Sequence, residues 1–214
     1  MFKFAVRLVT TLIVISFCLF SQTREKIKLN RPDLDRGLNV MQALKLRKST
    51  REFNPEELSL QDLSDLLWAA NGVNRPAEGK RTAPSSMNSQ DIDIYVFTKD
   101  AVYLYNAFEH QLEKVVDGDY RKDVAGRQQR MANAPVFLVL VSDLSRFPQG
   151  DEKRKMLIGA MDAGIVSQNI SIFCASRNLA TVPRATMDKE SLRKILKLKD
   201  SQVLMLNHPV SYMK

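Results

Sequence analysis

Residues 156–177 read MLIGAMDAGIVSQNISIFCASR and are the most informative segment of the chain. Apolar residues recur around most of the circumference of a helix of this length, so the segment predicts a long, largely buried helix. Small side chains let a neighbouring element approach a helix closely. The segment carries several of them, at Gly159, Ala160, Ala163, Gly164 and Ser167. We therefore expect a central helix covered by something large, such as another helix or a second copy of the chain.

Strands and further helices are expected on both sides of this helix. Residues 136–141 are continuously apolar and rich in β-branched side chains, which predicts a central buried strand. Residues 92–97 alternate in a way that predicts a half-buried strand. We also expect extended segments at 102–105, 181–185 and 203–206, and helices at 38–48, 59–72, 108–115, 120–132 and 189–196. Because helices and strands do not alternate strictly, the pattern favours an α+β fold with a mixed central β-sheet flanked by helices.

Length and composition limit the function classes. The 214 residues suffice for one α/β domain but not comfortably for two. The formal net charge of +8 leaves nucleic acid, anionic lipid and phosphorylated cofactors open as partners. No basic run is interleaved with aromatic residues, so we expect no nucleic-acid surface. His110 and His208 have no second His or Cys at ligand spacing, so we expect no metal site, and we interpret Asp162 and Gln168 as polar interface residues.

The N-terminal residues have the pattern of a secretory signal. Lys3 and Arg7 precede an apolar stretch, 8–20, that is short for a permanent membrane span. Export to the periplasm or cell envelope is therefore favoured. Acylation of Cys18, which would tether the chain to a membrane, and an uncleaved helical anchor stay open. The chain then divides into a signal peptide at 1–22, a linker or extended arm at 23–37 and one folded domain at 38–214.

Three polar segments could hold a ligand. Residues 47–53 (RKSTREF) place three cations and two hydroxyls where they could surround a phosphate, although a helix C-terminus favours cations in any case. Residues 79–90 (GKRTAPSSMNSQ) could present donors and acceptors to a heteroaromatic ring, or form an ordinary solvated loop. Residues 181–186 (TVPRAT) could lie against a flat ring or form an edge strand. None of the three is decisive alone.

The joint order of these segments resembles the nitroreductase family. Members of that family carry an early Arg-Arg-Ser-x-Arg-x-Phe, then Pro-Ser-Ser-x-Asn-x-Gln, and a Val-Pro segment shortly after a long central helix. The matching stretches here are 47–53, 84–90 and 182–183, and residues 67–75 (LWAANGVNR) are similar to the family's helix end before its flavin loop. The resemblance runs from about residue 40 to 212. It implies a nitroreductase-like fold and a homodimer, with the long helix at the interface and FMN bound between the subunits.

The resemblance also implies a role for each matched position. Arg47 and Ser49 would hold the FMN phosphate, and Lys48 could help. Arg51 would lie near the N1 and O2 edge of the flavin, where a cation stabilises the reduced ring. The partner subunit would supply ring and ribityl contacts from Pro84, Ser85, Ser86 and Asn88. One ring face would be covered, with a backbone N–H near N5, by Pro183, Arg184, Ala185 and Thr186. Arg130 matches a flavin-directed Lys of some members.

The function implied by the resemblance is an FMN-dependent oxidoreductase. Electrons would pass in a ping-pong cycle from NAD(P)H, or another reductant if the enzyme is exported, to a nitroaromatic, quinone or enone acceptor. No catalytic side chain is expected, because the cofactor carries the chemistry.

Departures from the family pattern keep alternatives open. Many relatives have Glu-Gly where this chain has Ala185 and Thr186, and larger members continue into a basic tail past the position of Lys214, which could itself replace a phosphate ligand. A non-catalytic exported flavin-binding or structural protein therefore stays open. So does an anion-binding surface protein that uses Arg47, Lys48 and Arg51 without flavin.

Overall fold

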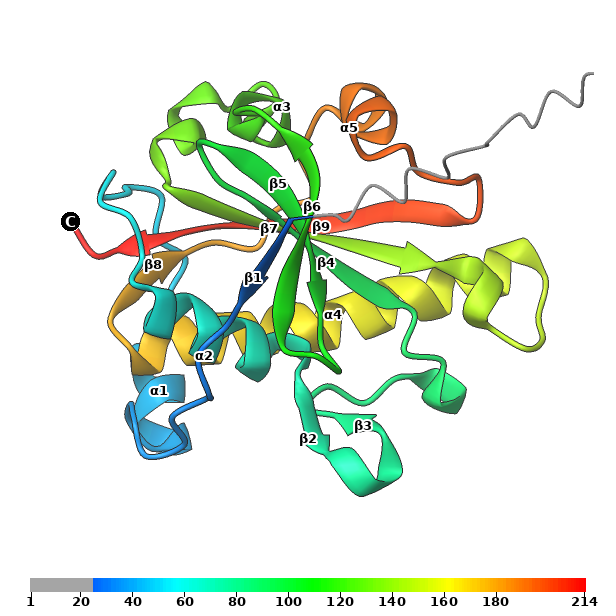
Figure 1. Cartoon of the computed structure of the whole chain (residues 1–214), viewed down its shortest axis with the longest axis horizontal. Helices are drawn as coiled ribbons and strands as arrows, with labels where there is room; N and C mark the ends of the chain where they lie inside the picture. Colours follow the sequence, from blue (N-terminus) through cyan, green and yellow to red (C-terminus); the bar gives the residue numbers. More distant parts are fainter. Residues whose placement is uncertain (1–24) are drawn as a thin grey trace, which may run out of the picture.

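The computed structural model describes residues 25–214, which form an α+β fold built on one large sheet (Figure 1). The expected signal peptide and Cys18 lie outside the described residues. The seven strands run in the order β1-β6-β5-β4-β7-β9-β8, and each described pair is antiparallel where a mixed sheet was expected. Their bounds are β1 Lys26–Lys28, β4 Ile92–Phe97, β5 Ala101–Asn106, β6 Gln111–Asp117, β7 Val136–Asp143, β8 Leu179–Thr181 and β9 Gln202–Tyr212. A small ribbon pairs β2 (Val73–Arg75) with β3 (Lys80–Arg81).

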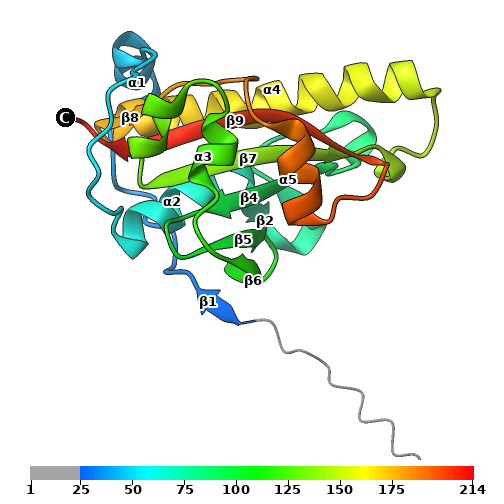
Figure 2. The same ribbon diagram turned by 90° about the horizontal axis from the view of Figure 1, so that it is seen from above.

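Helices cover both faces of the sheet. Figure 1 shows α1, α2 and α4 on one face and α3 and α5 on the other, and Figure 2 shows α4 running along most of the molecule. The bounds are α1 Val40–Leu46, α2 Leu60–Asn71, α3 Arg121–Ala125, α4 Glu152–Ser176 and α5 Lys189–Leu196. The α+β class and the long helix that the sequence predicts are therefore confirmed.

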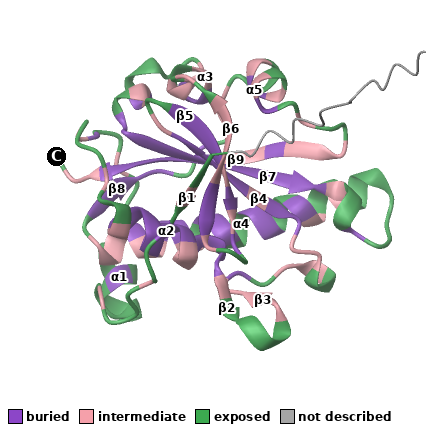
Figure 3. Ribbon diagram, in the orientation of Figure 1, coloured by how far each residue is buried: buried purple, intermediate pink, exposed green. Residues whose placement is uncertain are grey.

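The central strands are buried on both faces. On β7, Leu138 and Leu140 join the core under α2 and α4, whereas Val139 and Val141 join the core under α3 and α5. The strand is buried throughout, as Figure 3 shows, so the prediction of a central strand is confirmed. The half-buried character expected for residues 92–97 is wrong, because β4 lies between β5 and β7 and only Asp93 is partly exposed.

Two helix predictions are wrong. Residues 108–115 belong to a β5–β6 hairpin in which Asn106 pairs with Gln111. His110 takes a left-handed conformation in the turn, with φ of +45°. The apolar residues whose spacing indicated a helix instead lie in the exposed turn, at Phe108, and on β6. The helix expected over 120–132 stops at Ala125, because Gly126 follows with φ of +56°.

Small residues let α4 lie close to the sheet. A Cβ at Gly159 would collide with the hydroxyl of Ser142 on β7, and Ala163 is fully buried. Gly164, in contrast, faces open space. The helix is long and apolar enough to cross a membrane by length and composition alone, but its inner face packs on β4, β7 and β9. Gly159 and Ala163 therefore allow α4 to pack closely on the sheet, whereas Gly164 lies on a face of α4 that is not covered.

The buried carboxylate of Asp62 on α2 connects the segment before α1, the end of α4 and the end of β9. Asp62 accepts hydrogen bonds from the side chains of Arg36 at 2.7 Å, Arg177 at 3.2 Å, Tyr212 at 2.9 Å and Ser59 at 2.7 Å. Burial alone would raise the pKa of Asp62, but these hydrogen bonds and the charge of Arg36 outweigh it and lower the pKa to about 2. Asp62 therefore fixes the segment before α1 and the end of β9 against the helix layer.

We expect Asp62→Asn to lower the free energy of unfolding at pH 7 by about 2.5 kcal/mol, because each unit by which a carboxyl pKa is depressed is worth about 1.4 kcal/mol. This stabilisation is present above the unfolded pKa near 4 and is lost as the pH falls toward 2. Urea unfolding of both proteins at pH 7 and pH 3 should therefore show a difference that shrinks with acidification.

The exposed carboxylate of Asp35, in the same arm, provides the control. Asp35→Asn should leave the unfolding free energy nearly unchanged at both pH values. An Asp62→Asn defect of the same size at pH 7 and pH 3 would contradict the role assigned to the charge.

Candidate functional site

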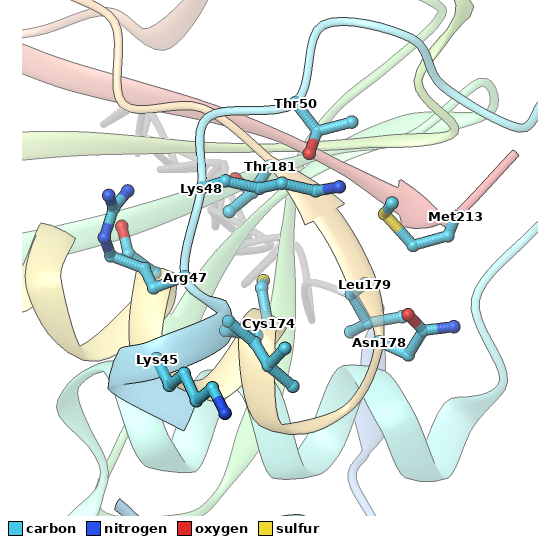
Figure 4. Close-up of a pocket in the computed structure, with 12 residues that line it drawn as sticks. Lys45, Arg47, Lys48, Thr50, Cys174, Asn178, Leu179, Thr181 and Met213 are labelled. Atoms are coloured by element: carbon cyan, nitrogen blue, oxygen red, sulfur yellow. The ribbon is translucent and has the colours of Figure 1, made fainter. Parts of the chain in front are cut away.

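A pocket of about 380 Å³ lies where the ends of α1 and α4 meet β8 (Figure 4). This volume is in the range of small-ligand sites. In Figure 4, Thr50, Lys48 and Thr181 lie together on one side, with Asn178, Leu179 and Met213 on the other. The full lining consists of Lys45, Leu46, Arg47, Lys48, Thr50, Ser171, Cys174, Ala175, Asn178, Leu179, Thr181 and Met213.

The residues that line the pocket include three cations and no acidic side chain. Lys45, Arg47 and Lys48 line it, and Arg51 and Ser49 follow on the exposed strip. Within residues 25–214, the side chains of Arg47, Lys48 and Arg51 form no ion pair or hydrogen bond. Charges left unpaired in this way are available to an anionic ligand.

Backbone contacts fix the strip beneath these cations. The N–H of Arg47 closes α1 by donating to the Ala43 carbonyl at 2.8 Å, and the N–H of Thr50 donates to the Thr181 carbonyl at 2.9 Å. Phe53 is buried in the core under α3 and α5, and the Asn54 N–H donates to Ser211 Oγ at 3.1 Å. The strip 47–54 is thus held to β8 and β9, so two of the three sequence segments meet at the pocket.

A buried, neutral histidine lies behind the pocket and contacts Thr181 of its lining. His208 is fully buried, with Nε2 2.7 Å from Ser167 Oγ and Nδ1 3.2 Å from Thr181 Oγ1. Burial lowers the pKa of His208 to about 3, so the ring is uncharged at neutral pH. The sequence pattern indicated neither this contact nor the lining by Asn178, because both depend on long-range pairing.

Arg184 serves the fold rather than a ligand. Its buried guanidinium donates to Gln128 Oε1 at 3.0 Å, Asn207 Oδ1 at 2.8 Å, the Val124 carbonyl at 3.4 Å and the Ala125 carbonyl at 2.7 Å. Burial lowers its pKa. The side chain therefore links β9 to α3, and the contact of the Arg184 segment with a flavin ring stays a prediction.

The rest of the third segment lies beside the pocket, not in its lining. Pro183 and Ala185 are exposed, and Thr186 lines a separate hollow of about 290 Å³ with Gly126 and Arg127. The predicted Arg130 is exposed on the 3-10 turn at 129–133. Lys214 follows Met213, so the end of the chain lies by the pocket.

The second segment lies toward the other end of α4. Pro84 and Ser85 line a small recess with Asp162, and the Ser86 N–H donates to Asp162 Oδ2 at 2.9 Å, while Asn88 is exposed. Asp162 is thus buried inside the chain, which corrects its interpretation as an interface residue. Twelve residues of α4 separate it from Cys174 at the pocket, a rise of roughly 18 Å. Within one chain the second segment is therefore remote from the pocket.

No group of three or more His, Cys, Asp or Glu that could hold a metal is found within residues 25–214.

Comparisons with known proteins match this architecture. The model of the nitroreductase family matches residues 44–212. A protein of Methanocaldococcus jannaschii assigned as a nitroreductase is 27% identical in an alignment 191 residues long that covers 85% of this chain and 96% of the relative. A crystal structure from Ralstonia eutropha JMP134, also assigned as a nitroreductase, superposes with a TM-score of 0.82 at 33% identity over 90% of this chain and 91% of that one.

A more distant structure shares the fold. It comes from Staphylococcus epidermidis, is assigned as an NAD(P)H:FMN oxidoreductase, and has a TM-score of 0.62 at 15% identity over 86% of this chain and 91% of that one. The family match over most of the sequence, together with the 33% identity to a solved relative, shows that the chain belongs to the nitroreductase family of oxidoreductases.

Proposed function

We propose that the protein is an FMN-dependent oxidoreductase that works in a ping-pong cycle, taking electrons from a donor such as NAD(P)H and passing them to a nitroaromatic, quinone or enone acceptor. The observation that carries the proposal is the unpaired cationic strip at 47–51 above a pocket of ligand size, at the position of the family's phosphate motif. The name of the Staphylococcus epidermidis neighbour, an NAD(P)H:FMN oxidoreductase, supports the choice of cofactor and donor.

The donors at the pocket suit a phosphorylated flavin. Arg47 and Lys48 would bind the phosphate with Ser49, and Arg51 would lie toward the ring edge that gains negative charge on reduction. FMN, when bound, supplies the hydride and electron chemistry, and the protein positions it and shapes the field around it. The N–H groups of Ala185 and Thr186 donate to no acceptor in the described part of the chain, so they are available to a ring nitrogen.

We further propose a homodimer that completes the site. The helix layer exposes large apolar side chains that a monomer would not normally leave in water. They lie on α1 and α4 and the segment before α1: Leu38, Val40, Met41, Leu44, Leu46, Met156, Leu157, Met161 and Ile165. A second copy on this face would cover α4 and could bring its own 84–88 loop to the cationic pocket.

We propose a location in the cell envelope, on the basis of the signal-like residues 1–22. Nicotinamide cofactors are scarce outside the cytoplasm, so the donor there could be a different reductant.

The purified protein should be yellow and retain about one FMN per subunit. Arg47→Ala should weaken FMN binding by roughly 1.5–3 kcal/mol, about 10- to 150-fold in Kd, because it removes a charge-assisted contact. Titration of the FMN-free protein with FMN, followed by fluorescence quenching, measures the change.

Lys189→Ala supplies the matched control, because Lys189 is an exposed cation of α5 on the opposite face of the sheet. It should leave the Kd unchanged. If Arg47→Ala binds FMN as wild type does, Arg47 has no place in the site. A wild-type protein that ignores added FMN would refute the proposal itself.

Met161→Glu should dissociate the dimer and release FMN together, because it places a charge on the uncovered face of α4, where Met161 is 54% exposed. We expect the dimer Kd to rise at least about 100-fold. Sedimentation velocity at several concentrations reports the assembly, and absorbance near 450 nm reports the flavin.

Phe108→Glu tests a surface residue of similar exposure in the β5–β6 turn, outside the set of side chains assigned to the interface. This variant should remain dimeric and yellow. A monomeric Phe108→Glu, or a Met161→Glu protein that stays dimeric, would argue against the assigned interface.

Turnover with NADH or NADPH and a quinone acceptor should give parallel double-reciprocal plots, which identify a ping-pong cycle. Stopped-flow reduction without acceptor should bleach the flavin. A protein that is yellow but is not reduced by either donor would instead favour another reductant, and one that shows no turnover with any donor would favour a non-catalytic flavin-binding protein.

A further inference from the structure

The loop that carries the second sequence segment has an unusual backbone. Met87, Asn88 and Gln90 have φ of +54°, +52° and +46°, in the left-handed region that residues other than glycine rarely adopt. Backbone conformations of this kind persist where the surrounding structure imposes them, and they cluster at binding sites.

Several hydrogen bonds hold the loop in this shape. Within it, the Gln90 N–H donates to Ser85 Oγ at 2.8 Å and Ser89 Oγ donates to the Ser86 carbonyl at 2.6 Å. Outside it, Arg146 donates to the Gln90 carbonyl at 2.8 Å. The bond from the Ser86 N–H to Asp162 Oδ2 is the contact that fixes the first half of the loop to α4.

Asp162 does not act alone, because a second carboxyl lies against it. Asp91 is fully buried at the start of β4, and the Ser142 hydroxyl donates to its Oδ2. Its Oδ1 is buried with no hydrogen-bond partner in the described structure. Burial and the neighbouring Asp162 raise the pKa of Asp91 to about 7, so Asp91 carries a proton below that pH. A protonated Asp91 can donate to Asp162 and avoids placing two negative charges side by side.

Within residues 25–214, no ion pair joins Asp91 or Asp162 to a cation. Asp162 is the one charged residue between Lys155 and Arg177. Arg146, at the end of β7, pairs with Asp93 at 2.6 Å and Asp143 at 3.7 Å. Arg81 of β3 also faces Asp93. Protonation of Asp91 therefore lowers the negative charge beside Asp162.

We propose that Asp162 is a positioning residue for the cofactor site of the other subunit, because it fixes the 84–88 loop through the Ser86 N–H, and that the buried Asp91 beside it supports this position. This inference rests on the proposed dimeric FMN function. Because the loop lies roughly 18 Å along α4 from the lining of the chain's own pocket, we assign it to the site of the second copy.

Subunit complementation tests this directly. Asp162→Ala and Arg47→Ala homodimers should each hold FMN poorly, because every site lacks one half. A heterodimer of the two, isolated with different tags, contains one site built from the intact strip of one subunit and the intact loop of the other. It should therefore retain about one FMN per dimer, as measured by absorbance. A heterodimer as empty as the parents would overturn the action across the interface.

The pH dependence of FMN retention tests the effect of protonating Asp91. Wild type should lose FMN affinity as the pH rises from 6 to 9, because Asp91 loses its proton and repels Asp162. Asp91→Asn, which mimics the protonated group, should keep its affinity over that range. Asp91→Asn with the same pH profile as wild type would overturn the role of the proton.

Two further variants separate positioning from loss of folding. Asp162→Asn retains an acceptor for the Ser86 N–H and should restore most of the FMN affinity lost in Asp162→Ala. Asp65→Asn changes another buried carboxylate, on α2, and should follow the wild-type pH profile. An Asp162→Ala protein that binds FMN like wild type would refute this inference while leaving the proposed function intact, whereas a colourless or monomeric wild type would refute the proposed function.

Discussion

The length of α4 is the constraint on which the arrangement of the site depends. This helix holds the cationic pocket near its C-terminal end, at Ser171 and Cys174, and the left-handed loop near Asp162. A helix is rigid on this scale, so the two regions are held roughly 18 Å apart in one chain. The two segments therefore do not meet at the pocket within one chain, and the proposed dimer would supply the loop from the second copy.

The position of α4 follows from how closely it packs on the sheet. Gly159 and Ala163 permit the approach, and β7 is buried on both faces beneath it. The fully buried His208, on β9, bonds to Ser167 of α4 on one side and to Thr181 of the pocket on the other. The packing that stabilises the core thus also fixes Thr181, a residue of the pocket lining, relative to α4.

Local signals made much of the fold predictable from the sequence. The helices predicted at 59–72 and 189–196 match α2 and α5, and Ser59 and Gly72 are the N-cap and C-cap of α2. The β5–β6 hairpin was missed because its apolar spacing also fits a helix, and its turn uses His110, not glycine, at a left-handed position.

The site was predictable only where its chemistry is local. Arg47 and Lys48 line the pocket, and a run of cations after a helix is visible in the sequence, whereas their binding of a phosphate stays a prediction. Arg184 has the same charge in an equally suggestive motif, yet its guanidinium is bonded inside the fold. The direction in which a side chain points depends on distant partners, as the Asp91–Asp162 pair also shows. The pocket meets the C-terminal ends of α1 and α4, where backbone carbonyls favour cations, so affinity for an anion there must come from the side-chain charges alone.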